Sequence, residues 1–284
     1  MSASATLSPE VASGDHAALA AACEEGVALC TIAGIEGSFS RRIGAQLAVY
    51  PDGRTVGSLA DRCLDAQLAS DVLNLRNVAL RRYGRGSGLI DFRLPCGGGL
   101  DILLDPSPDR DACRAAIRRL GNRQPAALKM PDASPLRRRD YVPALRIRAF
   151  GEGPELAMFA RLSRAIGIET DAVTKSDLAL GQPTTMAPAD AWTAIVLLFH
   201  DHEWELALIE EALAGDAFYI GAQGGETARV NRTVELLSRG TDEGALKRLH
   251  SPVGLIPACK TPEALALSVL AEVVGRYECG RDGP

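Results

Sequence analysis

The chain lacks the features of a secreted or membrane-spanning protein. Its seven cysteines include no CxxC pair, and its first residues have neither a basic start nor an apolar leader. No stretch reaches the roughly 18 unbroken apolar residues that a membrane span needs. The sequence therefore predicts a cytoplasmic protein with reduced thiols and no membrane association.

Positive charge and histidine are also scarce. Lys and Arg total 31 against 36 for Asp and Glu, which gives a net charge of −5. This balance opposes a phosphate backbone, so nucleic acid is not expected as a partner, although a local basic patch could hold one anionic ligand. The four histidines have no HExxH spacing, which argues against a histidine zinc site.

Enough apolar sequence is present, at 46% of the residues, to build real cores. The length exceeds a single domain of roughly 100–200 residues, so two domains are predicted. Residues 122–143 are rich in proline and arginine and have no apolar period, which indicates a linker between domains 1–121 and 144–284. The arginines at 137–139 are interpreted either as solvated charge or as an anion-facing patch at the domain junction.

Strand-like and helix-like periods alternate through the second half. The order is ALRIRAF, PELAMFARLSRAI, GIETDAV, WTAIVLLF, EWELALIEEALAG and AFYIGA, followed by a closing helix. Alternation of this kind predicts a parallel sheet with helices on both faces, a Rossmann-like domain. Ligands of such sheets lie at the carboxyl ends of the strands.

A glycine-rich turn follows the first of these strands. Gly151 and Gly153 match the first two glycines of the GxGxxG fingerprint, and Asp171 stands about 20 residues further on, as its ribose-binding acid would. Leu156 fills the third glycine position, and acidic residues in the turn would repel a pyrophosphate. An NAD(P)-binding oxidoreductase is therefore one alternative function.

Two further segments fall at the same predicted edge. His200 and Asp201 follow an apolar strand, and we interpret them either as a polar connection into the next helix or as ligand-cleft residues, with His200 able to transfer a proton near neutral pH. Gly224 and Gly225 close the next strand, where they would either let backbone approach an anion or form a simple turn.

The first half predicts a mixed α/β domain. A helix near 15–25, a strand VALCTIAGIEG, two strands around a Pro-Asp-Gly turn and a long helix after Asp61 follow in order. Cys63 lies in the first turn of that long helix on a polar face, either as a thiolate or as a small core residue. Cys96 and the glycines after it permit either close approach of a ligand or a bulged hairpin.

Several blocks resemble the XdhC/CoxI family. TIAGIEGSFSRRIGAQLAVYPDGRTVGSLADRCLDAQL is similar to the family's opening block and CGGGLDILLDP to its next one. FHDHEWELALIEEALAGDAFYIGAQGG and HSPVGLIPACKTPEALALSVLAEVV are similar to its Rossmann domain. Together these blocks cover nearly the whole chain in order.

The resemblance implies a bacterial accessory protein, more a chaperone than a turnover enzyme. Such a protein transiently binds the molybdenum cofactor in its molybdopterin form while a cysteine desulfurase exchanges an oxo ligand for sulfur. It then passes the cofactor to the apo-enzyme of a molybdenum-containing hydroxylase, of the xanthine dehydrogenase, aldehyde dehydrogenase or CO dehydrogenase type. The sequence leaves a homodimer open.

The resemblance also implies which residues bind the cofactor. They are Ser38, Arg41, Gly44, Ser58, Cys63, Cys96, Gly97 and Gly98 in the first domain, and Gly151, Gly153, His200 and Asp201 in the second. Arginine, serine hydroxyls and free N–H groups suit a pterin phosphate, and the soft thiols of Cys63 and Cys96 would lie nearest the metal. The expected place of the ligand is a cleft between the domains.

The chain departs from the family pattern at several of these turns. The substituted positions are Asp61, Arg62, Glu152, Pro154, Glu226 and Ala258. Bulk and negative charge at former glycine sites would obstruct an anionic ligand. A ligand-free paralogue that acts as an assembly or binding protein is therefore the second alternative function.

Overall fold

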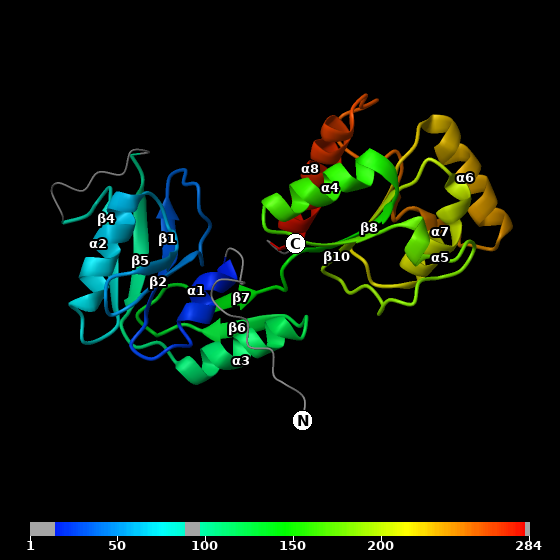
Figure 1. Ribbon diagram of the computed structural model, residues 1–284. Helices are drawn as coiled ribbons and strands as arrows, with labels where there is room; N and C mark the ends of the chain where they lie inside the picture. Colours follow the sequence, from blue (N-terminus) through cyan, green and yellow to red (C-terminus); the bar gives the residue numbers. More distant parts are fainter. Residues whose placement is uncertain (1–14, 89–96, 282–284) are drawn as a thin grey trace. The chain divides into compact units, whose positions relative to one another are not determined.

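The computed structural model describes residues 15–88 and 97–281 (Figure 1). The chain divides into two compact units, Met1–Pro143 and Ala144–Pro284. In the described ranges, no helix is long and apolar enough to cross a membrane.

The first unit contains an antiparallel sheet with the strand order β3-β2-β1-β5-β4. The strands are β1 (Ala28–Glu36), β2 (Gln46–Val49), β3 (Thr55–Gly57), β4 (Ala79–Gly84) and β5 (Gly99–Asp105). The predicted Pro-Asp-Gly turn joins β2 to β3, where Gly53 adopts φ 85° and the Arg54 N–H donates to Asp52 Oδ1 at 3.0 Å.

Both faces of this sheet are covered. The helices are α1 (Asp15–Ala21), α2 (Arg62–Leu73) and α3 (Arg110–Gly121). Successive β1 residues point to opposite faces, so Leu29 packs into the core with α1 and α3, whereas Cys30 packs into the core with α2. The apolar spacing of the sequence predicts a helix over residues 62–83, but α2 ends at Leu73, because residues 79–84 pair with β5 as a strand.

Residues 122–143 belong to the first unit, which corrects their interpretation as a linker. Strands β6 (Ala126–Lys129) and β7 (Arg138–Tyr141) form an antiparallel hairpin. Leu128 and Tyr141 are buried in the same core as α1 and α3. The apolar signal of the hairpin is short, and proline and arginine surround it, so the sequence alone resembles a linker.

The second unit contains a fully parallel sheet with the strand order β12-β11-β10-β8-β9. The strands are β8 (Arg146–Gly151), β9 (Glu169–Val173), β10 (Thr193–Leu198), β11 (Tyr219–Ala222) and β12 (Leu249–His250). This confirms the predicted fold class, a mixed α/β domain followed by a Rossmann-like domain with a parallel sheet.

Helices lie on both sides of the parallel sheet. They are α4 (Gly153–Ala165), α5 (Leu206–Ala214), α6 (Glu226–Ser238), α7 (Glu243–Leu246) and α8 (Pro262–Arg281), with short 3-10 turns η1 (Lys175–Asp177) and η2 (His202–Trp204). Helix α4 packs against α8, whereas α5 and α6 share a core with Phe150 and Ile195 (Figure 1).

The strand order reverses between β8 and β10. From β8 the chain crosses through α4 to β9, and from β10 it crosses through α5 to β11 on the other side. The loop after β8 leads to one side of the sheet, and the loop after the adjacent β10 leads to the other. Two loops that diverge in this way leave a crevice at the carboxyl edge of the sheet. The described topology therefore places the reversal of strand order at the edge where His200 and the glycine-rich turns were predicted.

Candidate functional site

A cavity of about 720 Å³ lies at this carboxyl edge. Its walls come from Glu155 on α4, His200 after β10, residues 223–225 after β11, and residues 252–262 and Leu265, which lead into and begin α8. The volume is within the range of roughly 300–1,000 Å³ that small-molecule sites occupy. We refer to it as the carboxyl-edge cavity.

The predicted residues of the second unit have different positions at this edge. His200 lines the carboxyl-edge cavity with its side chain 64% exposed, and its Nε2 lies 3.5 Å from Glu155 Oε2. Gly151 permits close strand packing, because a Cβ there would lie 2.7 Å from the Leu198 carbonyl oxygen. Gly153 begins α4 with φ 72°. Asp201 follows His200, and its Oδ1 accepts a hydrogen bond from the Glu203 N–H.

Lys175 neutralises part of the negative charge in this region. Its Nζ lies 2.8 Å from Glu152 Oε1 and 3.5 Å from Asp201 Oδ2. The hydrogen bond to Glu152 raises the pKa of Lys175, which therefore stays charged. The acidic turn after β8 repels an anion less than its sequence suggests.

Two helices begin at this edge without a side-chain cap. The N-cap residues are Glu152 for α4 and Gly225 for α6, and neither has a side chain that accepts from the first turn. Backbone N–H groups at such helix starts, together with the helix dipole, favour anions. A Cβ at Gly225 would meet nothing within 4 Å, so the cavity is open beside this turn.

A buried ion pair connects three of the loops at this edge. Arg232 of α6 is 3% exposed, and its Nε and Nη2 donate to Glu205 Oε2 at 2.9 and 2.6 Å. It also donates to the Gln223 carbonyl oxygen and to Ser251 Oγ, both at 2.7 Å. His202 Nδ1 lies 3.1 Å from the same Glu205 oxygen. Arg232 thereby fixes the segments after β10, β11 and β12.

Sequence reasoning missed this pair. Arg232 lies four residues before the buried Leu236, so a charged residue at an apolar-face position of α6 was the available signal. Burial raises the pKa of the Glu205 carboxyl, and Arg232 and His202 oppose that rise. Gln223 Oε1 is also buried and has no hydrogen-bond partner within the described part of the chain.

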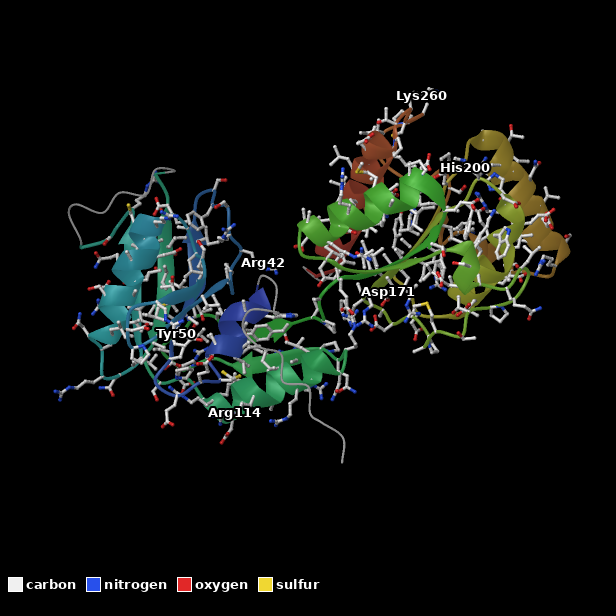
Figure 2. The ribbon with its side chains drawn as sticks, in the orientation of Figure 1. Arg42, Tyr50, Arg114, Asp171, His200 and Lys260 are labelled. Carbon is white, nitrogen blue, oxygen red and sulfur yellow. The ribbon has the colours of Figure 1, made fainter. Side chains whose placement is uncertain are left out.

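The wall formed by residues 252–262 is anchored on α8. Glu272 Oε2 accepts from the Gly254 N–H at 2.6 Å, and Ser268 Oγ accepts from the Ile256 N–H at 2.7 Å. This loop carries Cys259 and Lys260 into the lining of the carboxyl-edge cavity. Figure 2 labels Lys260 on the loop and His200 after β10. Lys260 is exposed and supplies a positive charge there.

The predicted residues of the first unit lie on neighbouring loops. Ser38, Arg41 and Gly44 lie in the connection from β1 to β2, whereas Ser58 and Cys63 lie between β3 and the first turn of α2. The Arg41 Nε donates to the Ser58 carbonyl oxygen at 3.3 Å, which brings the two loops together.

The other predicted glycines are near this region. A Cβ placed on Gly37 would lie 3.6 Å from Gly98 Cα, so Gly98 adjoins the loop that carries Ser38. Gly97 is exposed. Cys96 lies outside the described residues. Cys63 is exposed, and no group of three or more His, Cys, Asp or Glu side chains in the described ranges could hold a metal. The Cys63–Cys96 metal site stays a prediction.

Several polar groups of these loops already have partners. Ser58 Oγ donates to Asp65 Oδ2 at 2.8 Å, and Asp61 caps α2 by accepting from the Leu64 N–H at 2.9 Å. Arg139, from the arginine run at 137–139, donates from Nε to the Gly44 carbonyl oxygen at 2.6 Å. A Cβ at Gly44 would lie 2.5 Å from Arg139 Cδ. Gly44 therefore accommodates an arginine of the same unit.

Beyond Gly151 and Gly153, the positions of the dinucleotide-binding fingerprint do not lie where a bound dinucleotide would need them. Asp171 lies in the middle of β9 and not at its carboxyl end, and its Oδ2 lies 4.0 Å from Arg148 Nε. Leu156, in place of the third glycine, is buried in the packing of α4. Neither position matches what a dinucleotide needs from this turn.

The fold and the carboxyl-edge cavity define a two-unit α/β protein whose second unit is a Rossmann-like domain. Residues 147–273 match the sequence model described as the XdhC Rossmann domain, and residues 20–84 match that of the XdhC and CoxI family. The chain is 31% identical over 268 residues to the molybdenum cofactor insertion chaperone PaoD of Escherichia coli (strain K12), covering 88% of this chain and 83% of that protein. The chain belongs to the XdhC and CoxI family.

A solved structure shares the whole fold. A crystal structure titled as a xanthine dehydrogenase from Bacillus halodurans superposes with a TM-score of 0.69, covering 94% of this chain and 96% of that chain. The two sequences are 18% identical, so this likeness concerns the fold alone.

Proposed function

We propose that this chain binds the molybdenum cofactor, in its molybdopterin form, as cargo and assists its insertion into the apo-enzyme of a molybdenum-containing hydroxylase. The observation that carries the proposal is the 31% identity, over most of both chains, to a protein named as a molybdenum cofactor insertion chaperone. The proposal includes a cytoplasmic location and sulfuration of the bound cofactor by a cysteine desulfurase. The recipient is of the xanthine dehydrogenase, aldehyde dehydrogenase or CO dehydrogenase type.

The residues of the carboxyl-edge cavity suit such a cargo, which presents a phosphate and the ring amides of a pterin. Uncapped N–H groups at the start of α6 and the charge of Lys260 favour a phosphate. Gln223 Oε1, which is buried without a described partner, can accept a hydrogen bond from a pterin N–H. His200 can donate or accept at the rim of the cavity.

The remaining predicted residues keep their roles as part of this proposal. Those assigned to cargo contacts are Ser38, Arg41, Gly44, Ser58, Cys63, Cys96, Gly97, Gly98, Gly151, Gly153 and Asp201. Arg41 and the Ser38 hydroxyl are exposed, so they are available to an anion. Cys63 is the described thiol that the proposal assigns to the metal.

The test is anaerobic purification from a host replete in the cofactor, followed by molybdenum analysis and pterin fluorescence. The wild-type protein is expected to retain both signals. Gly225→Val places a side chain in the open space of the cavity without backbone strain, because Gly225 has φ −79°. This variant is expected to lower retention at least about tenfold.

The matched control is Gly275→Val, at an exposed position of α8 with no neighbour within 4 Å. It is expected to retain both signals, like the wild type. Absence of molybdenum and pterin from the wild-type protein, with no rescue of a partner dehydrogenase, would contradict the proposal.

Two measurements separate the alternatives. Saturable enhancement of NAD(P)H fluorescence would favour the oxidoreductase. Unchanged complementation by a Cys63→Ala, Arg41→Ala double variant would favour an assembly protein that has lost its ligand.

A further inference from the structure

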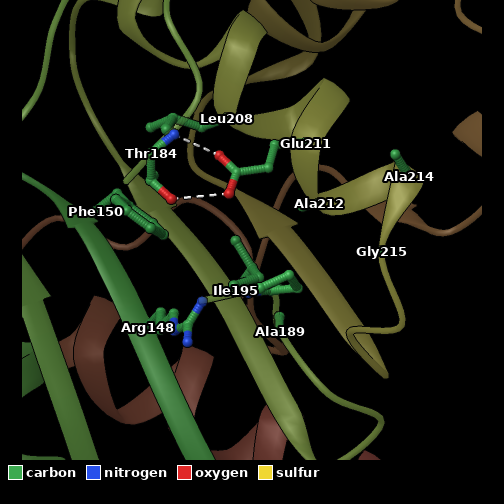
Figure 3. A pocket seen from close by; sticks show the side chains of 11 residues that line it. Arg148, Phe150, Thr184, Ala189, Ile195, Leu208, Glu211, Ala212, Ala214 and Gly215 are labelled. Atoms are coloured by element: carbon green, nitrogen blue, oxygen red, sulfur yellow. Dashed lines mark hydrogen bonds between the residues drawn. The ribbon is translucent and has the colours of Figure 1, made fainter. Parts of the chain in front are cut away.

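The second unit contains another cavity, of about 260 Å³, between the sheet and α5 (Figure 3). Arg148 and Phe150 of β8, Ile195 of β10, and α5 form its walls together with the segment that includes Thr184. It shares no lining residue with the carboxyl-edge cavity. We refer to it as the α5 cavity.

Most of the lining of the α5 cavity is apolar. The apolar side chains are Phe150, Pro188, Ala189, Ile195, Leu208, Ala212 and Ala214. Three polar side chains, of Arg148, Thr184 and Glu211, interrupt this surface. A pocket with an apolar body and a few convergent polar groups is the usual form of a small-molecule site.

Two of these polar side chains bind each other. Glu211 Oε2 accepts from the Thr184 N–H at 2.6 Å, and Glu211 Oε1 accepts from Thr184 Oγ1 at 2.8 Å (Figure 3). Both carboxylate oxygens are thereby directed to the segment that covers the cavity. Glu211 is not a hydrogen-bond partner of Arg148 among the interactions of the described residues.

The Arg148 guanidinium is buried but only partly paired. It is 7% exposed, and its Nη1 donates to the Ala187 carbonyl oxygen at 2.5 Å. Its Nε is buried and, within the part of the chain that the structure describes, has no hydrogen-bond partner. The nearby carboxylate of Asp171 lies 4.0 Å from Nε and is 41% exposed. A buried guanidinium ordinarily has a hydrogen-bonded anion, because an incompletely paired charge is costly to bury.

We propose that the α5 cavity binds a small monocarboxylate with a compact apolar body, whose carboxylate accepts hydrogen bonds from the Arg148 guanidinium. The apolar walls take the body of the ligand, and Arg148 takes its charge. The negative charge of Glu211 in the same lining disfavours a dianion such as a phosphate monoester. The site is independent of the cargo function proposed above.

The experiment is a calorimetric titration of the full chain with benzoate and, in parallel, with benzamide, its uncharged isostere. Benzoate is expected to bind one site, and benzamide at least about tenfold more weakly, since it lacks the charge that Arg148 pairs with. Arg148→Gln is expected to abolish this preference for the charged ligand, with the fold checked by circular dichroism.

A second variant keeps the test decisive if Arg148→Gln fails to fold. Ala189→Leu adds volume from the covering segment and is expected to weaken benzoate binding at least about tenfold without touching the strand. Lys260→Gln, in the carboxyl-edge cavity, is the control and is expected to leave benzoate affinity unchanged. No saturable binding of benzoate, or equal binding by the wild type and Ala189→Leu, would overturn the proposal.

Discussion

At the scale of single residues, the buried pair of Arg232 and Glu205 has the largest consequences. Both side chains are almost fully buried, so neither charge can be solvated if its partner is lost. Removing one member of such a pair leaves an uncompensated charge in a low-dielectric interior. The same arginine connects Gln223 and Ser251, so its loss also disturbs two segments near the carboxyl-edge cavity.

Arg232→Met is expected to lower the free energy of unfolding by about 3–5 kcal/mol, measured by urea denaturation. The matched control is Arg239→Met, at the C-cap of α6, which breaks a partly exposed pair with Glu210 and is expected to cost far less. Adding Glu205→Leu to Arg232→Met is expected to recover part of the loss, because it removes the stranded charge. Equal losses for the two single variants would contradict this account.

Ala258 is strained, because it adopts φ 53° where a β-carbon is unfavourable. Ala258→Gly is expected to stabilise the protein by about 0.5–1 kcal/mol through relief of this strain. Thermal and urea unfolding measure the change. The reverse behaviour is expected of Ala271→Gly, at an exposed position inside α8, which should cost about 1 kcal/mol. Destabilisation by both glycines would contradict the prediction.

At the scale of elements, β12 brings a titratable side chain to the edge of the parallel sheet. His250 of β12 stacks on Tyr219 of β11 with ring centroids 4.7 Å apart. Burial lowers the pKa of His250, with a further contribution from Arg276, although Glu272 opposes the shift. The native state therefore favours the neutral ring more than the unfolded chain does.

This shift has a defined sign in the stability of the protein. The stability that the neutral ring contributes is present above the unfolded pKa of about 6.5 and is lost as pH falls through the lower folded pKa. His250→Phe keeps an aromatic ring and removes the titration. Between about pH 7.5 and about pH 5, the wild type is expected to lose more unfolding free energy than His250→Phe. An identical loss in both proteins would show that His250 does not titrate in this way.

At the scale of the whole molecule, the division at Pro143 assigns the β6–β7 hairpin to the first unit. The hairpin covers α1 and α3 with Leu128, and the Tyr141 hydroxyl donates to the buried Gln46 Oε1 at 2.6 Å. A first unit that ended at residue 121 would expose this core and leave Gln46 without that partner.

Two fragments test this boundary. The fragment 1–143 is expected to unfold cooperatively in urea, whereas the fragment 1–121 is expected to unfold over a broad range and to bind a hydrophobic dye. Circular dichroism and dye fluorescence measure both properties. A cooperative transition of similar midpoint in the shorter fragment would contradict the assignment of the hairpin to the core.

Local patterns were sufficient to predict the strands and helices of the second unit and the sheet edge at which the carboxyl-edge cavity lies, but not β4 or the β6–β7 hairpin. His200 follows an apolar run directly, and parallel strands collect their carboxyl ends at one edge, so its position at the carboxyl-edge cavity follows from periodicity. The turn at Asp52 and Gly53 was predictable for a similar reason, since glycine supplies the left-handed conformation that the turn requires.

Pairings between distant residues were decided only by the tertiary structure. Glu205 and Arg232 are 27 residues apart, and Gln46 and Tyr141 are 95 apart, and in neither case does the local sequence indicate the partner. The amino-acid sequence by itself determined the two-unit α/β architecture, because strand and helix periods depend on neighbours in the chain. Arg232 fixes its loops through charge pairing with Glu205, and residues 126–141 pack into the core of the first unit. Both arrangements join segments that are remote in the sequence, and only the folded chain brings such segments together.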